Sequence, residues 1–168
     1  MKGGAYFSPC GRYRYSLLRE WDAAKPRMVF CGLNPSTADA SNDDPTIRRE
    51  MAFARAWGFG SMVKVNAYAW RSTDPKGLWT APDPIGPRNP EFVLEWALQG
   101  KLFVACWGTN IRLRDADQLR RDLAAEGVKV YALRLTKEGH PQHPLYLPAS
   151  TRPFRWPGGE PWSPPGGA

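Results

Sequence analysis

Four short apolar runs rich in β-forming residues, separated by stretches with helical spacing, constrain the fold of this chain more than any other feature. Continuous apolar runs of this length suit strands buried in a parallel sheet. Strands that alternate with helices are typical of a sheet covered by helices on both faces. The sequence therefore predicts an α/β protein: a three-layer α/β/α sandwich with a four-stranded, mainly parallel sheet. The predicted strands are residues 28–31, 61–66, 102–107 and 128–133.

Residues that cap helices mark where the predicted helices begin. Asp44 and Asn89 each stand before a proline. An N-cap residue followed by proline at the first helical position is a common start signal. A later, basic helix is expected to begin after Thr109 or Asn110. The predicted helices are 14–21, 45–57, the stretch from Asn89 to Gly100, and the one capped by Thr109 or Asn110.

The chain of 168 residues is long enough for one domain with a substantial core. We expect a single α/β domain over residues 1–147. Residues 148–168 are rich in Pro and Gly and predict an extended or disordered C-terminal tail. The connection 67–87 is long and contains several Pro and Trp residues, which suggests a functional loop or a lid.

The formal net charge of +7 raises the expectation that DNA or another polyanion is the partner. Cations and rings alternate at Arg12-Tyr-Arg-Tyr15, which suits either nucleic-acid contacts or amphipathic packing. No apolar run approaches the roughly 18 residues that a membrane span needs. We therefore expect a DNA-binding monomer without a membrane segment.

The three cysteines, Cys10, Cys31 and Cys106, are odd in number and form no CxxC pair. This pattern argues against a disulfide framework, a zinc site and an iron–sulfur cluster. The sequence therefore predicts a reducing compartment, most simply the cytoplasm, and no cofactor or metal.

Polar residues follow several predicted strands at the point where each strand ends. Asn34 lies just past the first, Asn66 ends the second, and His143 lies in the loop beyond the last. The carboxyl ends of parallel strands share one edge of the sheet, where ligands bind in open α/β sheets. We therefore expect Asn34, Asn66 and His143 to meet around one ligand, with Trp107 and Gly108 on the same edge.

Four short motifs carry a resemblance to known families. Gly32-Leu-Asn-Pro-Ser36 resembles motif A of the uracil-DNA glycosylase superfamily, nearest its mismatch-specific branch. Val63-Lys-Val-Asn66, Val104-Ala-Cys-Trp-Gly108 and His143-Pro-Leu-Tyr-Leu147 are similar to later motifs of that superfamily, in the same order. Over roughly residues 12–147 the pattern looks closer still to a bacterial and phage family catalogued as domain of unknown function 1643.

The resemblance implies a uracil-DNA glycosylase-like fold and roles for individual residues. Asn34 would position the attacking water, and His143 would donate to the base where negative charge develops. Asn66 would read the edge of a flipped base. The remaining residues implied in substrate binding are Gly32, Leu33, Pro35, Ser36 and Trp107, with Phe53 or Tyr68 stacking on the base and Leu145 or Tyr146 filling the gap in the duplex. Arg112, Arg114, Arg120 and Arg121 form a basic helix face that suits either solvent or DNA phosphates.

The chain also departs from the glycosylase pattern. Asn34 replaces the carboxylate of the most active uracil enzymes, so slower chemistry is expected. Ser36 replaces a bulky aromatic residue, which leaves room for thymine or a larger 5-substituted pyrimidine. The Ser-Pro of the His-Pro motif is missing. Asp44 is most simply a helix cap, and a metal-binding or catalytic role for Asp39, Asp43 and Asp44 is the alternative.

These observations predict a DNA glycosylase-like hydrolase that acts on a mismatched or modified pyrimidine (uracil, thymine or a 5-substituted base). Two alternatives remain. The first is a module of the same fold that binds a base or nucleotide without cleaving it. The second is a hydrolase or transferase that acts on free nucleosides or nucleotides.

Overall fold

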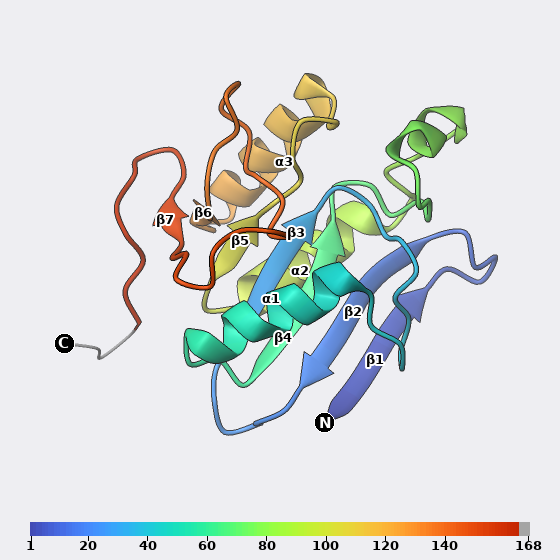
Figure 1. Cartoon of the computed structure of the whole chain (residues 1–168). Helices are drawn as coiled ribbons and strands as arrows, with labels where there is room; N and C mark the ends of the chain where they lie inside the picture. The colour runs from blue at the N-terminus through green and yellow to red at the C-terminus, as the bar shows by residue number, and fades with distance from the viewer. Residues whose placement is uncertain (165–168) are drawn as a thin grey trace.

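The computed structural model describes residues 1–164 and shows an α/β protein built around one mixed sheet (Figure 1). Within these residues seven strands lie in the order β1-β2-β4-β3-β5-β6-β7. The strands are β1 (Lys2–Phe7), β2 (Arg14–Glu20), β3 (Arg27–Gly32), β4 (Ser61–Asn66), β5 (Phe103–Ala105), β6 (Val130–Ala132) and β7 (Phe154–Arg155).

The four strands predicted from the sequence are confirmed as the parallel centre of the sheet, but the expectation of a four-stranded sheet is wrong. β4, β3, β5 and β6 pair in parallel. β1 and β2 extend one side and β7 the other, all through antiparallel pairs. An α/β protein with a mixed sheet is therefore the observed class.

The predicted helix over residues 14–21 is also wrong, because these residues form β2. β2 lies between β1 and β4, and its Leu17 and Leu18 stand opposite Lys64 and Val63. The alternation of Arg and Tyr over residues 12–15, where β2 begins, has period two, which is the spacing of a strand. Hydrogen bonding to a neighbour on each side outweighs the local helical spacing.

The C-terminal segment is not an extended or disordered tail over the part that the structure describes. β7 pairs with β6, and Trp156 and Trp162 are buried. The ring of Trp162 packs 5.5 Å from that of Phe59, between centroids. These two tryptophans hold the segment on the domain despite its Pro and Gly content, so the domain extends past residue 147. Residues 165–168 of the predicted tail lie outside the described residues.

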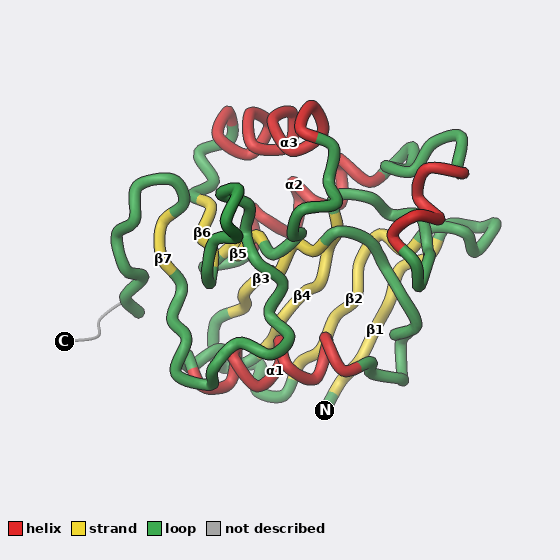
Figure 2. The backbone as a smooth tube through the Cα atoms, turned by 45° about the horizontal axis from the view of Figure 1, so that its top comes forward, coloured by secondary structure: helices red, strands yellow, loops and turns green. Residues whose placement is uncertain are grey.

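The sheet lies between two layers of helices (Figure 2). α1 (Pro45–Ala56) covers one face, and α2 (Asn89–Gln99) and α3 (Leu113–Ala125) cover the other. Alternation along β3 supplies both cores: Met28 and Phe30 pack with α1, while Val29 and Cys31 pack with α2 and α3. None of the helices in residues 1–164 is both long and apolar enough to cross a membrane.

Of the predicted helix starts, the one at Asp44 is confirmed and the other two are wrong. Asp44 caps α1 as predicted, since its side chain accepts the backbone N–H of Ile47 at 2.9 Å. Asn89 is not a cap: Arg88 holds that position, and Asn89 lies inside the first turn of α2. α3 begins at Leu113 with Arg112 as N-cap, later than Thr109 or Asn110. A short 3₁₀ helix, η1 (Pro75–Thr80), lies in the long connection 67–87.

The order of the parallel strands fixes where a ligand can bind. The chain runs from β3 to β4 on one side, and then crosses to β5 on the other side of β3. β3 and β5 are neighbours whose following helices, α1 and α3, cover opposite faces. A crevice opens at such a switch point, beyond the carboxyl ends of the strands.

Candidate functional site

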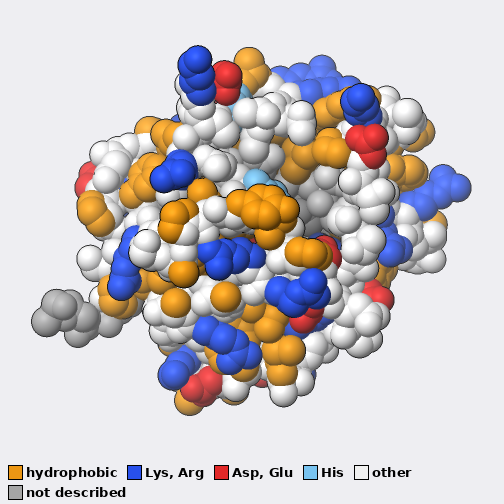
Figure 3. All heavy atoms as spheres, in the orientation of Figure 1, with side chains coloured by type: hydrophobic (Ala, Val, Ile, Leu, Met, Phe, Trp, Pro, Cys, Tyr) orange, Lys and Arg blue, Asp and Glu red, His pale blue; other side chains and the backbone are white. Residues whose placement is uncertain are grey.

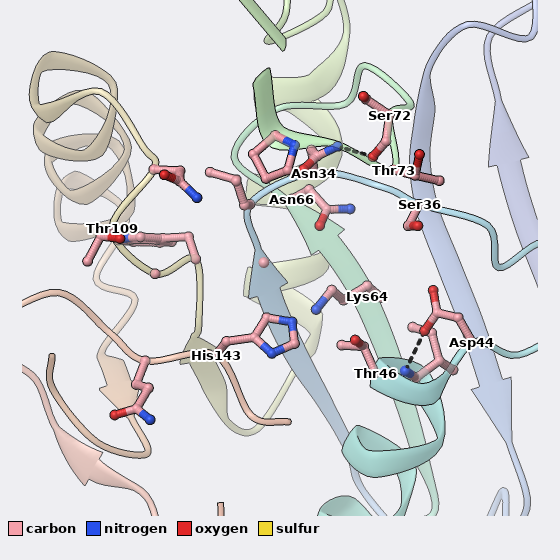
Figure 4. A pocket seen from close by; sticks show the side chains of 18 of the residues that line it. Asn34, Ser36, Asp44, Thr46, Lys64, Asn66, Ser72, Thr73, Thr109 and His143 are labelled. Carbon is pink, nitrogen blue, oxygen red and sulfur yellow. Dashed lines mark hydrogen bonds between the residues drawn. The ribbon is translucent and has the colours of Figure 1, made fainter. Parts of the chain in front are cut away.

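A cavity of about 470 Å³ occupies this switch point. A volume of this size is within the range of small-molecule sites. The lining residues come from β2, β3, β4, the start of α1, and the loops after β3, β4, β5 and β6 (Figure 4). Among the residues predicted from the sequence, those that line it are Gly32, Leu33, Asn34, Ser36, Asn66, Trp107 and His143. The expected meeting of Asn34, Asn66 and His143 around one space is thus observed.

Asn66 presents an unused amide to this cavity. It ends β4 opposite Gly32 and is 1% exposed. Its Oδ1 and Nδ2 are both buried, and neither has a hydrogen-bond partner within the described chain. A buried polar group without a partner costs free energy of about 1–3 kcal/mol. Asn66 therefore offers one donor and one acceptor to a ligand.

Lys64, two residues earlier on β4, supplies the floor with a positive charge. It lies on the same side of the strand as Asn66 and points into the same space as His143 (Figure 4). Its ammonium donates to Oε1 of the fully buried Glu50 on α1. Cys106 is a neutral thiol at pH 7, because burial raises its pKa to about 12. Glu50 is therefore the anion that faces Lys64.

Burial acts on both members of the Glu50–Lys64 pair. It raises the pKa of Glu50, and the attraction of Lys64 opposes this effect. Burial alone would lower the pKa of Lys64, but the charge and the hydrogen bond of the Glu50 carboxylate oppose this effect and the pKa is raised. The Lys64 ammonium therefore stays protonated at the floor of the cavity.

Gly32 is needed because the floor residues cross directly over it. A Cβ atom at this position would lie 2.7 Å from Lys64 Nζ and 3.0 Å from Asn66 Oδ1. A side chain at this position would therefore displace the Lys64 ammonium and crowd the Asn66 amide. This contact explains the glycine of the Gly-Leu-Asn-Pro-Ser motif.

Arg14 and Asp44 add one charge of each sign to the lining. Arg14, on β2, is buried, and its Nη1 donates to the backbone oxygen of Ala38 at 2.7 Å. Its Nε has no partner within residues 1–164. Burial lowers the pKa of Arg14 to about 10, and the nearby carboxylates oppose this effect. Arg14 is therefore still a cation at neutral pH.

Asn34 is held by the long connection after β4. Its Nδ2 donates to the backbone oxygen of Ser72 at 2.8 Å and to that of Pro35 at 3.1 Å (Figure 4). Because the amide nitrogen is used, the carbonyl oxygen is the part of the side chain left for a ligand or a water. Ser72, Thr73 and Pro75 of the same connection line the cavity.

His143 reaches the cavity from the loop after β6. Its Nδ1 accepts the backbone N–H of Leu145 at 3.2 Å, so the neutral ring carries its proton on Nε2. Desolvation, assisted by the Lys64 ammonium and opposed by Asp44, lowers the pKa of His143 to about 4. Although His143 is partly open to solvent, desolvation and the Lys64 charge act in the same direction, so the ring is a neutral Nε2–H donor at pH 7.

Several predicted binding residues lie away from the cavity lining. Phe53 is buried in α1, stacked on Trp57 at 5.2 Å and covered by the guanidinium of Arg49. Tyr68 is buried behind the cavity, where its hydroxyl donates to Asp115 at 2.6 Å. Both rings are committed to the protein's own packing, which does not fit stacking on a flipped base. The buried Pro35 serves the loop through its carbonyl oxygen.

The two residues predicted to fill the gap in a DNA duplex, Leu145 and Tyr146, differ in exposure. Leu145 is half-buried, whereas Tyr146 is 93% exposed and adopts a φ of 71°. A positive φ is unusual for a bulky residue and holds the ring out from the loop that carries His143. Of the two, Tyr146 is therefore the side chain that projects into solvent.

The four predicted DNA-binding arginines spread along α3. Arg112 lies over the ring of Trp79, 4.2 Å from its centroid, and Arg120 lies over Trp156 at the same distance. Arg114 is mostly exposed, and Arg121 donates to Gln118. On the face that carries α1, Lys and Arg side chains are likewise spread out with acidic ones among them, and do not gather in one stripe (Figure 3).

The three aspartates near α1 have separate structural roles. Asp39 accepts hydrogen bonds from Ser41 and Asn42, Asp43 pairs with Arg19 at 2.8 Å, and Asp44 caps α1. Across residues 1–164, no three His, Cys, Asp or Glu side chains gather in a way that could hold a metal ion.

Sequence reasoning missed Arg14, Lys64 and Glu50. A signal for Lys64 was present, because a lone lysine inside an apolar strand, two residues before Asn66, must share its side of the strand. Arg14 was hidden by the incorrect assignment of β2 as a helix. Glu50 reads as an ordinary polar position of an amphipathic helix, and only the packing of α1 on β4 shows its partner.

Comparison with known proteins gives one match. No curated protein and no solved structure matches the chain. A family model described as "Protein of unknown function (DUF1643)" matches residues 14–145, which include β2 through the His143 loop and every element that lines the cavity. The chain therefore belongs to the DUF1643 family.

Proposed function

We propose that this protein binds a pyrimidine base flipped out of DNA and hydrolyses its N-glycosidic bond. The observation that carries the proposal is the unused amide of Asn66, buried in a cavity that Asn34 and His143 also line. One donor and one acceptor held side by side match the edge of a pyrimidine. The buried position supports selection, because a wrong base would leave the amide unpaired.

The balance of donors and acceptors favours bases with two carbonyl groups. Asn66 Nδ2, Trp107 Nε1 and Arg14 Nε are buried N–H donors without partners in the described part of the chain. Lys64 and the neutral His143 add further N–H groups at the lining. Uracil, thymine and 5-substituted uracils present two carbonyl oxygens, whereas cytosine replaces one of them with an amino donor. We therefore place uracil-type bases ahead of cytosine-type bases.

The same groups suit the chemistry of glycosidic cleavage. In the reaction, the bond from C1′ to the base nitrogen breaks and its electron pair leaves with the base, while a water oxygen bonds to C1′ and releases a proton to solvent. Asn34 Oδ1 would accept a hydrogen bond from that water and orient it. His143 Nε2–H and the Lys64 ammonium would stabilise the charge on the departing base. An amide is no strong base, so slow turnover is expected.

Alkaline strand cleavage tests the proposal directly. The protein is incubated with duplexes that carry uracil, a G·T mismatch, a 5-substituted uracil or a 5-substituted cytosine, and then treated with alkali to break abasic sites. We expect breaks at the uracil-type bases and loss of breaks in Asn66→Ala and His143→Ala. Gln118→Ala, a change on an exposed side of α3, is the matched control. Folded protein that breaks none of the duplexes would refute the proposed reaction.

A second candidate is binding or turnover of free nucleotides. It is favoured by Arg14 and Lys64, because two cations in one cavity suit a phosphate better than a neutral base. Binding of uridine monophosphate, at least tenfold tighter than binding of uridine and lost in Arg14→Gln, would support it. Equal affinity for the two compounds would count against it.

A further inference from the structure

A second cavity of about 430 Å³ lies between α2 and α3, on the other side of the sheet from α1. Its walls are largely apolar and include Val93, Leu94 and Leu119. Carboxylates stand among these side chains: Glu91 from α2, and Asp122 and Glu126 from α3. None of the described lining residues is a lysine or an arginine. In a chain of net charge +7, this is a local reversal of sign.

Asn89 adds a buried, unused acceptor to this cavity. It lines the cavity from the first turn of α2 and is 2% exposed. Its Nδ2 donates to the backbone oxygens of Asn66 and Ala67, at 2.8 and 3.2 Å, which fixes the orientation of the amide. The opposite atom, Oδ1, has no partner among residues 1–164. This orphaned oxygen is the observation that points to a ligand with an N–H donor.

The other polar groups of this cavity have the same preference. Asp115 already accepts the Tyr68 hydroxyl at 2.6 Å, and Asp122 accepts the amide of Gln118 at 2.8 Å. Glu126 accepts no side-chain hydrogen bond in the described structure, and Glu91 approaches only Arg88, at 3.8 Å. Acceptors and negative charge around an apolar space are complementary to a cation with an apolar body.

We propose that the α2–α3 cavity binds a small organic cation, an ammonium or guanidinium group attached to an apolar body. The cationic head donates to Asn89 Oδ1 and is attracted by the net negative charge of the carboxylates that line the cavity. The apolar body packs on Val93, Leu94 and Leu119. This site is separate from the cavity at the switch point and does not depend on the function proposed for that cavity.

The test compares ligands of the same shape and different charge. Phenethylammonium carries the cation and the apolar body, 2-phenylethanol lacks the charge, and methylammonium lacks the body. Each is titrated into ¹⁵N-labelled full-length protein, and binding is followed by ¹H–¹⁵N NMR. We expect phenethylammonium to shift signals of α2, α3 and the Asn89 side-chain amide, and to bind about fivefold or more tighter than either control.

Variants assign the binding to this cavity. Asp122→Asn with Glu126→Gln removes two lining charges and should abolish the preference for phenethylammonium over phenylethanol. Glu95→Gln with Asp117→Asn removes two charges from exposed positions of the same helices, outside the cavity, and should leave the preference intact. Equal affinity for the charged and neutral compounds, equal weakening by both double variants, or shifts located elsewhere would overturn the proposal.

Discussion

The amide of Asn66 is available to a ligand because no other described part of the protein uses it. Its neighbours hold it in place without hydrogen-bonding it: Gly32 gives it space, and Asn89 anchors the backbone oxygen of the same residue from behind. The backbone of this residue is therefore fixed before a ligand arrives, which lowers the entropic cost of recognition. The position of this residue at a strand end was predictable from the sequence. Its lack of hydrogen-bond partners was not predictable, because it depends on every chain segment around the side chain.

The Glu50–Lys64 pair should show opposite effects in single and double variants. Lys64→Met leaves the Glu50 carboxylate buried without its partner and should lower the free energy of unfolding by about 3–5 kcal/mol at pH 7. Glu50→Leu combined with Lys64→Met removes both charges and should recover stability to within about 1 kcal/mol of the wild type. Denaturant unfolding monitored by circular dichroism measures both values.

The activity of the same double variant separates stability from function. If Lys64 serves the cavity, the refolded double variant should still fail to cleave uracil-containing duplexes. Full cleavage by the double variant would mean that Lys64 serves only the fold. The matched control is Lys25→Met, which removes a mostly exposed lysine paired with Asp22 at the surface.

His143 should make activity depend on pH in one direction. Desolvation is the main cause that lowers its pKa to about 4, so the neutral Nε2–H donor is present from neutral pH down to about pH 5. Above pH 6, cleavage should not change with the protonation state of His143. It should fall as the pH approaches 4, because the proton added to Nδ1 removes the hydrogen bond from the Leu145 N–H that orients the ring. The depressed pKa also means that folding stability from this group is complete above the unfolded-state pKa of about 6.5 and is lost as the pH falls through about 4.

NMR titration of the imidazole provides the direct measurement. The His143 ring signals should titrate well below those of a histidine in a short peptide. A midpoint near 6.5 would contradict a desolvated neutral ring. In that case, any acid loss of activity would have to come from another group.

At the scale of elements, the parallel centre of the sheet could be predicted because each of its strands is a continuous apolar run. β2 and β7 could not be predicted in this way. β2 contains Arg14, Ser16 and Arg19, all buried, and the two arginines find partners only after the segment before α1 has folded against them. β7 is held by pairing with β6 and by two tryptophans, within a segment whose Pro and Gly content favours an extended chain.

The C-terminal segment should therefore contribute to stability, which is the opposite of what a disordered tail would do. Trp162→Ala removes a ring that is 8% exposed and packs on Phe59 and Trp57. It should lower the free energy of unfolding by about 3 kcal/mol. Tyr146→Ala is the matched aromatic control: that ring is 93% exposed, and the change should stay within about 0.5 kcal/mol of the wild type. Equal effects of the two variants would refute the docking of this segment.

At the scale of the whole molecule, the net charge of +7 raises local phosphate concentration but does not say where DNA lies. α3 is informative because it begins beside the switch-point cavity, next to Thr109 and Asn110, and runs away from it. Arg112 and Arg114 are at the near end. Arg121 lies roughly 13 Å further along the helix than Arg112, at a rise of 1.5 Å per residue. DNA that delivers a base to the cavity should therefore meet the near pair first.

Two double variants compare these ends of α3 at equal change in net charge. Arg112→Gln with Arg114→Gln should reduce the slope of log affinity against log salt by up to about 1.8, that is, about 0.9 for each lost phosphate contact. Arg120→Gln with Arg121→Gln should reduce it less, because the second pair lies farther from the cavity mouth. Fluorescence anisotropy with a uracil-containing duplex at several salt concentrations measures both slopes, and thermal unfolding checks that the loss of the Arg112–Trp79 contact leaves the fold intact. Equal reductions would place the duplex along the whole helix, whereas unchanged slopes in both variants would remove α3 from the DNA-facing surface.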